Sequence, residues 1–345
     1  MEYVSHQHVM ERYPYDQHDK IPLPMGVKAG RYINWVNLSD HPHWLIAGQT
    51  GSGKTNTIRV ILSTLISQQS PADVRFFLID LKRGGDLNPY RKAPHVIGDV
   101  YKTVEDVDVL MQQLKILMYQ RLETISKITN DIDDYNAIVA PEHKMPRLVV
   151  VFDEYAAIQA AGKDLFKSIE QNAVMLATQS RAAGIHMMIG TQQSYSDNIN
   201  KQIKGNITFA LGGRQRTLGA AMSVFGTGTS RDLAKIPGRM ACDDGQNVYP
   251  VQIPHLSHEA LKLSLRAVGK WEPVPFDLPD LASDEDGDIT VYDEFNEDMV
   301  VRIAIEEFDG VLASRKIWQI INRNDVSFNN VLDMVESLKG RIIPE

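Results

Sequence analysis

The chain has 345 residues, of which 43% are hydrophobic and 23% charged, a composition typical of a globular protein with one large domain and a smaller one. Its single cysteine, Cys242, excludes an internal disulfide and a cysteine-ligated metal cluster, and it fits a reducing, cytoplasmic setting. No apolar run approaches the roughly 18 residues that span a bilayer, and the N-terminus lacks the apolar core of a signal peptide.

The net charge of −8 has a local origin. The stretch from Phe276 to Gly310 holds 13 of the 44 acidic residues and only one of the 36 basic residues, Arg302. The rest of the chain has 31 acidic against 35 basic residues. The negative total therefore does not exclude a DNA-binding surface.

Residues 1–40 are polar and contain three prolines, which predicts an arm with one or two short strands. From His43 onwards, short apolar runs alternate with stretches that have helical periodicity. This alternation predicts an α/β fold over residues 41–270, with a parallel central sheet wrapped by helices. The expected strands are 44–48, 74–80, 147–154, 184–192 and 206–213, and the expected helices are 54–67, 104–129 and 166–183.

Residues 271–298 are rich in proline and acidic residues and have little periodicity, which predicts a linker. Residues 299–345 are expected to form a small helical domain with helix–turn–helix spacing. Its last predicted helix carries Asn329 and Asn330, and asparagine is a natural partner for adenine. DNA reading, protein docking and plain structural packing remain open for this domain.

Residues 48–55, "GQTGSGKT", match the pattern G-x-x-x-x-G-K-[ST] between a predicted strand and a predicted helix. Glycines in such a loop let backbone N–H groups surround phosphates, and the start of a helix favours anions. Lys54 is expected to reach the terminal phosphates of ATP, and the Thr55 hydroxyl to ligate Mg²⁺. The predicted nucleotide-binding residues are Gly48, Gln49, Thr50, Gly51, Ser52, Gly53, Lys54 and Thr55.

Two acidic residues follow the apolar strand "LVVVF". Asp153 is expected to hold the metal through water, and Glu154 to orient and deprotonate the attacking water. Gln192, at the end of the next buried strand, is a candidate sensor of the terminal phosphate. Arg181, near a helix end, is either a solvated cation or an arginine that completes the site of a neighbouring subunit.

Four blocks in this order resemble the signature blocks of the FtsK/SpoIIIE DNA translocases, which belong to the FtsK–HerA ring ATPases. The resemblance covers about residues 25–255, although "TQQSY" stands where the family usually has a proline-containing "TQRP". The blocks are "HWLIAGQTGSGKT", "FFLIDLKRGGDLNPYRKAPHVIGDVYKT", "LVVVFDEYAAI" and "SRAAGIHMMIGTQQ".

The resemblance implies a RecA-like P-loop NTPase core that forms a hexameric ring around double-stranded DNA and hydrolyses ATP at subunit interfaces. It places Lys54 and Thr55 on the phosphate-loop pair, Asp153 and Glu154 on the acidic pair, and Arg181 on the arginine that serves the neighbouring subunit. Lys82 falls on a lysine that follows Asp80 of the second strand. The C-terminal residues resemble, more weakly, the winged-helix module that ends FtsK-type motors, and a membrane segment found in division members is not expected.

Basic residues in two predicted loops are candidate contacts for DNA phosphates. Lys201 and Lys204 lie in the first loop, and Arg214 and Arg216 in the second, together with Arg231. Each loop is also compatible with an ordinary solvated surface. Arg214 and Arg216 have the further alternative of serving a nucleotide site across a subunit interface.

These observations predict an ATP-dependent translocase of double-stranded DNA that uses Mg²⁺ and assembles as a homo-oligomer. The alternatives within the same superfamily are a protein-secretion ATPase and a coupling or packaging ATPase for conjugation or virion filling. A nucleotide-gated docking protein with weak hydrolysis is a further alternative.

Overall fold

The computed structural model describes residues 4–13, 21–82, 85–192, 199–281, 300 and 333–335. The chain divides into two compact units, residues 1–281 and 282–345, and the fold below is that of the first unit. Most of the predicted C-terminal domain, including Asn329 and Asn330, lies outside the described residues. The structure therefore does not test its helical or winged-helix character.

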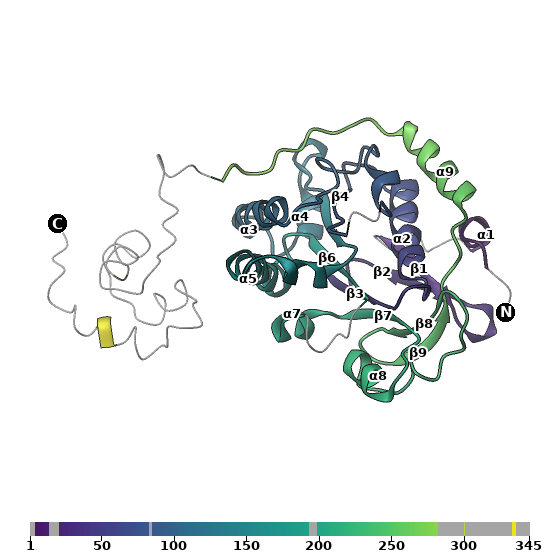
Figure 1. The fold of residues 1–345 in the computed structure, drawn as a ribbon. Coiled ribbons are helices and arrows are strands. Elements are labelled where there is room, and N and C mark those ends of the chain that lie inside the picture. The colour runs from purple at the N-terminus through teal and green to yellow at the C-terminus, as the bar shows by residue number, and fades with distance from the viewer. Residues whose placement is uncertain are drawn as a thin grey trace, which may run out of the picture. The chain divides into compact units, whose positions relative to one another are not determined.

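The first unit is built on a mixed sheet of nine strands in the order β2-β1-β9-β8-β7-β3-β6-β5-β4 (Figure 1). Strands β7, β3, β6, β5 and β4 are parallel to one another, and the remaining pairs are antiparallel. The strands are β1 Pro22–Val27, β2 Ile33–Asn37, β3 His43–Ala47, β4 Val74–Ile79, β5 Arg147–Phe152, β6 Ile185–Thr191, β7 Phe209–Gly213, β8 Arg239–Asp243 and β9 Val248–Gln252.

The parallel part of the sheet confirms the predicted α/β fold, and each of its five strands lies where the apolar runs indicated. The antiparallel half is wider than expected, because β8 and β9 were not predicted. Strands β1 and β2, assigned to an N-terminal arm, continue the same sheet. Pro22 and Pro24 cannot donate backbone hydrogen bonds, and β1 pairs with β9 only where Val27 lies opposite Gln252.

The helices confirm the predicted stretches at 54–67, 104–129 and 166–183 to within a few residues at each end. Thr103 begins α3 by accepting a hydrogen bond from the Asp106 N–H, a typical N-cap contact. The helices are α1 His6–Arg12, α2 Lys54–Gln68, α3 Val104–Ser126, α4 Ile132–Ile138, α5 Lys163–Gln179, α7 Lys201–Asn206, α8 Leu218–Phe225 and α9 His258–Ala267. Short 3₁₀ turns cover Ala29–Arg31, Asn88–Tyr90, Pro141–His143, Tyr155–Ala160 and Val268–Lys270.

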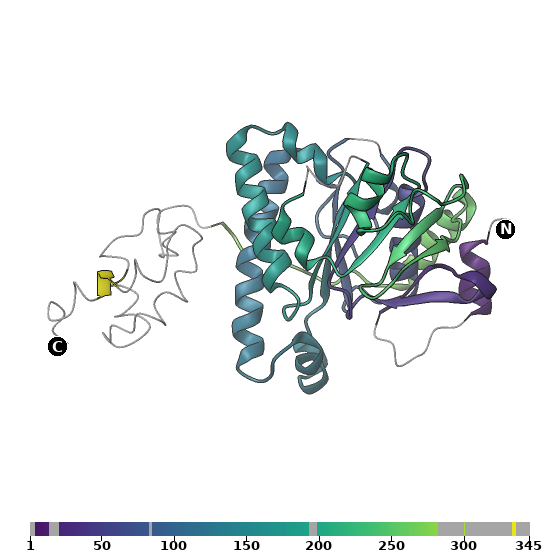
Figure 2. The same cartoon turned by 90° about the horizontal axis from the view of Figure 1, so that it is seen from below.

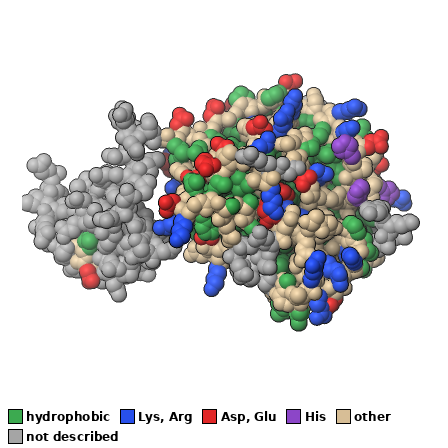
Figure 3. Space-filling view, in the orientation of Figure 1, with side chains coloured by type: hydrophobic (Ala, Val, Ile, Leu, Met, Phe, Trp, Pro, Cys, Tyr) green, Lys and Arg blue, Asp and Glu red, His purple; other side chains and the backbone are tan. Residues whose placement is uncertain are grey.

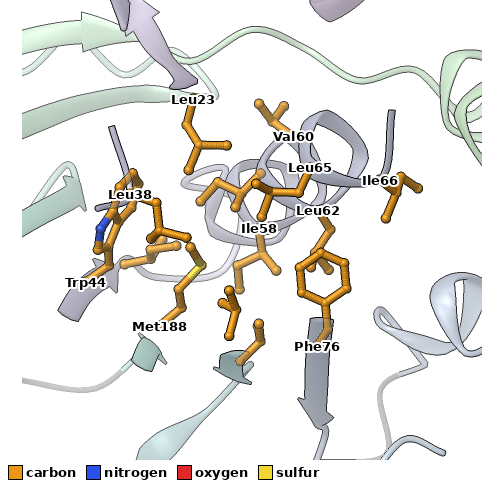
Figure 4. Packing of buried hydrophobic residues seen from close by; sticks show 14 of the residues in the cluster. Leu23, Leu38, Trp44, Ile58, Val60, Leu62, Leu65, Ile66, Phe76 and Met188 are labelled. Atoms are coloured by element: carbon orange, nitrogen blue, oxygen red, sulfur yellow. The ribbon is translucent and has the colours of Figure 1, made fainter. Parts of the chain in front are cut away.

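Helices cover both faces of the sheet (Figures 1 and 2). Side chains alternate along β3, so that Trp44 and Ile46 pack in the cluster that includes α2 and α9 (Figure 4). Leu45 and Ala47 pack in the opposite cluster with α3 and α5. Burial on both faces explains why the parallel strands are continuous apolar runs rather than alternating ones.

The carboxyl ends of the parallel strands bring distant parts of the sequence to one edge of the sheet. Gly48, Asp80, Asp153, Gln192 and Arg214 each follow directly after one of these strands. Ligands of open α/β sheets bind at this edge. The fold therefore gathers the phosphate loop and the acidic pair in one place.

Strand β4 lies at one edge of the sheet, and residues 95–101 cover its open side. The Phe76 N–H donates to the His95 carbonyl at 2.8 Å, and the Ile97 N–H donates to the Phe76 carbonyl at 2.9 Å. The Tyr101 N–H donates to the Leu78 carbonyl at 2.8 Å. Backbone groups of β4 that would be free at a sheet edge are thus used within the chain.

Three buried histidines make the fold sensitive to acid. Burial lowers the pKa of His6 and of His43 to about 4 in each case. Burial and the neighbouring Arg147 guanidinium lower the pKa of His186 as well. A histidine that is neutral when folded and free to bind a proton when unfolded destabilises the fold as pH falls below its unfolded pKa.

We expect the free energy of unfolding to be nearly constant between about pH 7 and 8 and to decrease between pH 6.5 and 4, by about 1 kcal/mol per buried histidine over the first pH unit. Urea unfolding at a series of pH values measures this. His6 bonds Thr64 Oγ1 at 2.8 Å through Nε2, so His6→Gln should reduce the slope. His8→Gln, on the exposed side of the same helix, is the matched control and should leave it unchanged.

Candidate nucleotide-binding site

The phosphate loop, residues 48–53, connects β3 to α2 and is held at both ends by backbone hydrogen bonds. The Gly48 N–H donates to the Thr191 carbonyl at 2.9 Å, and the Gly238 N–H donates to the Ser52 carbonyl at 3.0 Å. Gly53 has a φ of +106°, and a Cβ there would lie 2.8 Å from the Gly238 Cα. Only glycine fits this position, because both the backbone conformation and the close approach exclude a side chain.

Lys54, the first residue of α2, forms a buried ion pair with Asp153. Its Nζ lies 2.7 Å from Asp153 Oδ1 and also donates to the Asp153 carbonyl oxygen. The side chains are only 3% and 8% exposed, respectively. A lysine ammonium has three donors, so one N–H of Lys54 remains for another acceptor such as a phosphate oxygen.

The hydroxyl of Thr55 meets a carboxylate that sequence analysis did not identify. Thr55 Oγ1 donates to Asp86 Oδ2 at 3.2 Å, and Asp86 Oδ1 pairs with Arg59 at 2.8 Å. Asp86 lies in the loop after β4, within the block "LIDLKRGGDL". That block is one of the four that resemble the FtsK/SpoIIIE family, and this resemblance is the one sequence feature that could have pointed to Asp86 as a site residue.

Glu154 is buried next to the Lys54–Asp153 ion pair, and two groups donate hydrogen bonds to its carboxylate. Its carboxylate accepts from the Gln192 backbone N–H, at 3.1 Å to each oxygen. Lys82 Nζ lies 2.9 Å from Glu154 Oε2. The structure thus places Gln192 beside Glu154, and the backbone N–H of Gln192 makes the contact. The role of Gln192 as a sensor of the terminal phosphate stays a prediction.

The end of β6 approaches β5 so closely that a side chain does not fit between them. A Cβ on Gly190 would lie 2.6 Å from the Phe152 carbonyl oxygen, and closer still to that of Asp153. The Asp153 carbonyl is an acceptor of Lys54. Gly190 therefore lets the Lys54–Asp153 pair form across the end of β6.

Arg181 lies away from this site. It is exposed, in the turn between α5 and β6, which precedes the amino end of β6. The phosphate loop is at the carboxyl edge, and the seven residues of β6 span about 20 Å. In this chain Arg181 therefore does not belong to the constellation around Lys54 and Glu154.

The predicted DNA-binding cations also separate into two groups. Lys201 and Lys204 lie on α7, before β7, with Lys201 exposed and Lys204 half-buried. Arg214 and Arg216 are exposed and follow β7, next to the phosphate loop, because a Cβ on Gly213 would lie 2.5 Å from Ser52 Cβ. Figure 3 shows Lys and Arg side chains gathered over the region of α8. Arg231, beyond α8, pairs with Asp232 on the surface.

The polar groups of the loop fit a metal-bound nucleotide. Ser52 Oγ is buried without a hydrogen-bond partner, and a Cβ on Gly51 would meet no atom within 4 Å. Among the described residues, no cluster of three or more His, Cys, Asp or Glu forms a metal site by itself. Thr55, with Asp86 and Asp153 nearby, suits Mg²⁺, which is usually bound by one or two protein groups together with water and phosphate.

A glycine-rich loop between a strand and a helix, with an acidic pair at the end of a second parallel strand, defines a P-loop NTPase fold. Comparison with protein-family models matches residues 7–196 to the FtsK/SpoIIIE family. This match covers more than half of the chain, and the chain belongs to that family.

Curated relatives carry names of DNA translocases. The chain is 35% identical to DNA translocase SftA of Bacillus subtilis over 208 residues, which are 59% of this chain and 20% of SftA. It is 28% identical to DNA translocase FtsK of Haemophilus influenzae over 272 residues, 66% of this chain and 50% of that protein. The chain thus spans between a fifth and a half of the length of these relatives.

Solved structures share the fold. The pCW3 conjugation coupling protein TcpA, in a monomer form with ATPgS, gives a TM-score of 0.66 at 24% identity and covers 74% of this chain and 73% of its own. The cytoplasmic domain of the type VII secretion ATPase EccC of Thermomonospora curvata gives 0.66 at 21% identity, covering 77% and 34%. No helix among the described residues is long and apolar enough to cross a membrane.

We expect Gly190→Ala to weaken both the fold and nucleotide binding, because the added methyl group displaces the carbonyl that holds Lys54. The loss of stability should be about 1–3 kcal/mol, the usual cost of overpacking. Thermal unfolding and titration with a fluorescent ATP analogue measure the two effects. Gly205→Ala, where a Cβ meets nothing within 4 Å, is the control, and equal behaviour of both variants would contradict the prediction.

Proposed function

We propose that the chain hydrolyses ATP with Mg²⁺ to move double-stranded DNA, and that it does so as a homo-oligomeric ring, most simply a hexamer. The observation that carries this proposal is the arrangement of Lys54, Asp153 and Glu154 at one sheet edge with Arg181 at the other. The names of the curated relatives support DNA as the substrate.

Each residue of the site has a role that follows from its contacts. Lys54 has one N–H left for a terminal phosphate oxygen, and the buried pair with Asp153 fixes where its ammonium lies. Thr55 offers a hydroxyl oxygen to Mg²⁺, while the same hydroxyl donates a hydrogen bond to Asp86. The bound metal would neutralise charge on the phosphates. Glu154, with its buried carboxylate, is the general base that orients and deprotonates water.

A cation supplied by a neighbouring subunit would stabilise the charge of the transition state together with Lys54. Arg181 is exposed, and the structure gives its side chain no hydrogen bond or ion pair within the described residues. Because it lies at the far edge of the sheet, it can serve such a site only in another subunit. A ring that places this edge against the neighbour's phosphate loop would complete every site in turn.

The turn that carries Arg181 is rigidly held, as an arginine acting in trans requires. The buried Arg121 guanidinium donates to the Ala183 carbonyl at 3.0 Å, and the Ile132 N–H donates to the Ala182 carbonyl at 2.9 Å. The Ser180 hydroxyl donates to the Ile185 carbonyl at 2.7 Å. The backbone around Arg181 is therefore fixed while its side chain reaches into solvent.

DNA contacts are proposed for Lys201, Lys204, Arg214 and Arg216. Exposed lysine and arginine side chains neutralise phosphates without regard to sequence. The position of Arg214 beside the phosphate loop would couple a DNA contact directly to the nucleotide. A role for Asn329 and Asn330 remains a prediction from sequence.

We expect duplex DNA to increase the rate of ATP hydrolysis, because a translocase couples hydrolysis to movement along bound DNA. Steady-state ATPase assays with linear duplex DNA, single-stranded DNA and no DNA measure this. Glu154→Gln should lower kcat by a factor on the order of 10²–10⁴, the usual contribution of a general base, and retain ATP binding. A rate that is unchanged by duplex DNA but raised by a protein cargo would contradict the DNA proposal.

We expect two inactive variants to restore activity when mixed. Arg181→Ala should lose a factor on the order of 10³ in kcat, while its own loop and Glu154 remain intact. Glu154→Gln subunits keep Arg181 and bind ATP, so a mixed ring contains interfaces with a complete site. ATPase rates of the mixture are compared with those of each variant alone. A mixture no more active than the sum of its parts would exclude action of Arg181 in trans.

A further inference from the structure

Lys82 forms an ion pair with the buried Glu154 carboxylate. The family resemblance gives this lysine a position after Asp80 but no role. Its Nζ lies 2.9 Å from Glu154 Oε2. The lysine side chain is 42% exposed, whereas the glutamate side chain is 1% exposed. The charge of Glu154 is therefore compensated by a lysine that reaches in from the surface.

The contacts of Glu154 leave one acceptor site unused. A carboxylate has about four lone-pair sites. The Gln192 N–H donates to both oxygens, and Lys82 donates to Oε2. Oε2 is thus saturated, and Oε1 retains one free position for a hydrogen bond from water.

The two donors come from different strands and together fix the plane of the carboxylate. Gln192 follows β6, and Lys82 follows β4, on the two sides of β5, which carries Glu154. Without Lys82, the carboxylate would keep the contact with the Gln192 N–H and lose the cation with which it is paired among the described residues. A buried charge without a counter-ion is costly, so the side chain would gain by turning toward solvent.

The turn that carries Lys82 is itself anchored. Asp80, which is 1% exposed, accepts a hydrogen bond from the Gly85 N–H at 2.9 Å through Oδ2. The Asp80 N–H donates to the Tyr101 carbonyl at 2.9 Å. Lys82 thus projects from a turn whose start is tied to the sheet and to the strand cover at residues 95–101.

We propose that Lys82 is a positioning residue for hydrolysis, which holds Glu154 so that the free site on Oε1 receives the attacking water. This inference rests on the proposed role of Glu154 as the general base. It gives Lys82 and Lys54 different roles, because Lys54 is paired with Asp153 next to the phosphate loop, whereas Lys82 is paired with the proposed base.

The test measures kcat and ATP affinity of Lys82→Ala in the full-length chain with duplex DNA. A misplaced base costs on the order of 10²-fold in rate, so we expect kcat to fall by about that factor while the Kd of a non-hydrolysable ATP analogue stays within about twofold. Lys82→Arg should retain most of the activity. Lys92→Ala, an exposed lysine in the same connection between β4 and α3, is the matched control and should behave as the wild type.

Chemical rescue distinguishes a positioning role from a structural one, because an added amine would not restore kcat if Lys82 only stabilised the fold. Because Lys82 is partly exposed, ethylammonium can enter the space left by its side chain in Lys82→Ala and restore part of kcat in a saturable way. It should not restore Glu154→Gln or the double variant Lys82→Ala/Glu154→Gln. Thermal unfolding of each variant confirms that it is folded.

The outcomes separate this inference from the proposed function. Full activity of Lys82→Ala, a loss of ATP affinity that matches the loss of kcat, or absence of rescue by ethylammonium would each overturn the positioning role. Wild-type activity of Glu154→Gln would instead overturn the role of Glu154 as the base. If Glu154→Gln loses activity and Lys82→Ala keeps it, the positioning role of Lys82 is rejected and the role of Glu154 as the base stands.

Discussion

The site depends on a buried ion pair that spans a strand. Lys54 follows the phosphate loop after β3, Asp153 follows β5, and β6 lies between these strands in the sheet. The lysine must cross the end of β6 to reach its partner, and this is possible only because Gly190 has no side chain. The crossing joins three strand ends into one unit. It also places Glu154, the next residue, against the backbone of Gln192.

The sequence predicts the parallel half of the fold well, for a physical reason. Strands buried on both faces are continuous apolar runs, and "RLVVVF" cannot lie anywhere but inside. The acidic pair is predictable for the same reason, since two carboxylates directly after such a run must lie at the strand's end. By contrast, "RMACD" and "VYPVQ" are short and contain charged residues or a proline. Their pairing depends on long-range contacts that no local pattern indicates.

The remaining contacts of the site escape sequence analysis in different ways. Glu154 contacts the backbone N–H of Gln192, and every residue except proline has such a group. Asp86 lies in a loop without periodicity, where an acidic residue is usually solvated. Arg181 was predicted from a resemblance, and its distance from the phosphate loop became apparent only with the topology. The pattern of a motif indicates which strand end a residue follows, but the partner of each side chain depends on how the strands are ordered.

The covering of β4 by residues 95–101 has a consequence for how copies of this chain can meet. Sheet extension from one copy to the next is hindered at this edge, because backbone groups of Phe76, Leu78 and Asp80 already bond to residues 95–101. Contacts between copies along this edge would then be made mainly by side chains. Such contacts can slide and re-form without breaking a ladder of backbone bonds. Interfaces made by side chains suit an assembly whose subunits change their relative orientation during a reaction cycle. Each such movement then requires only an exchange of surface contacts.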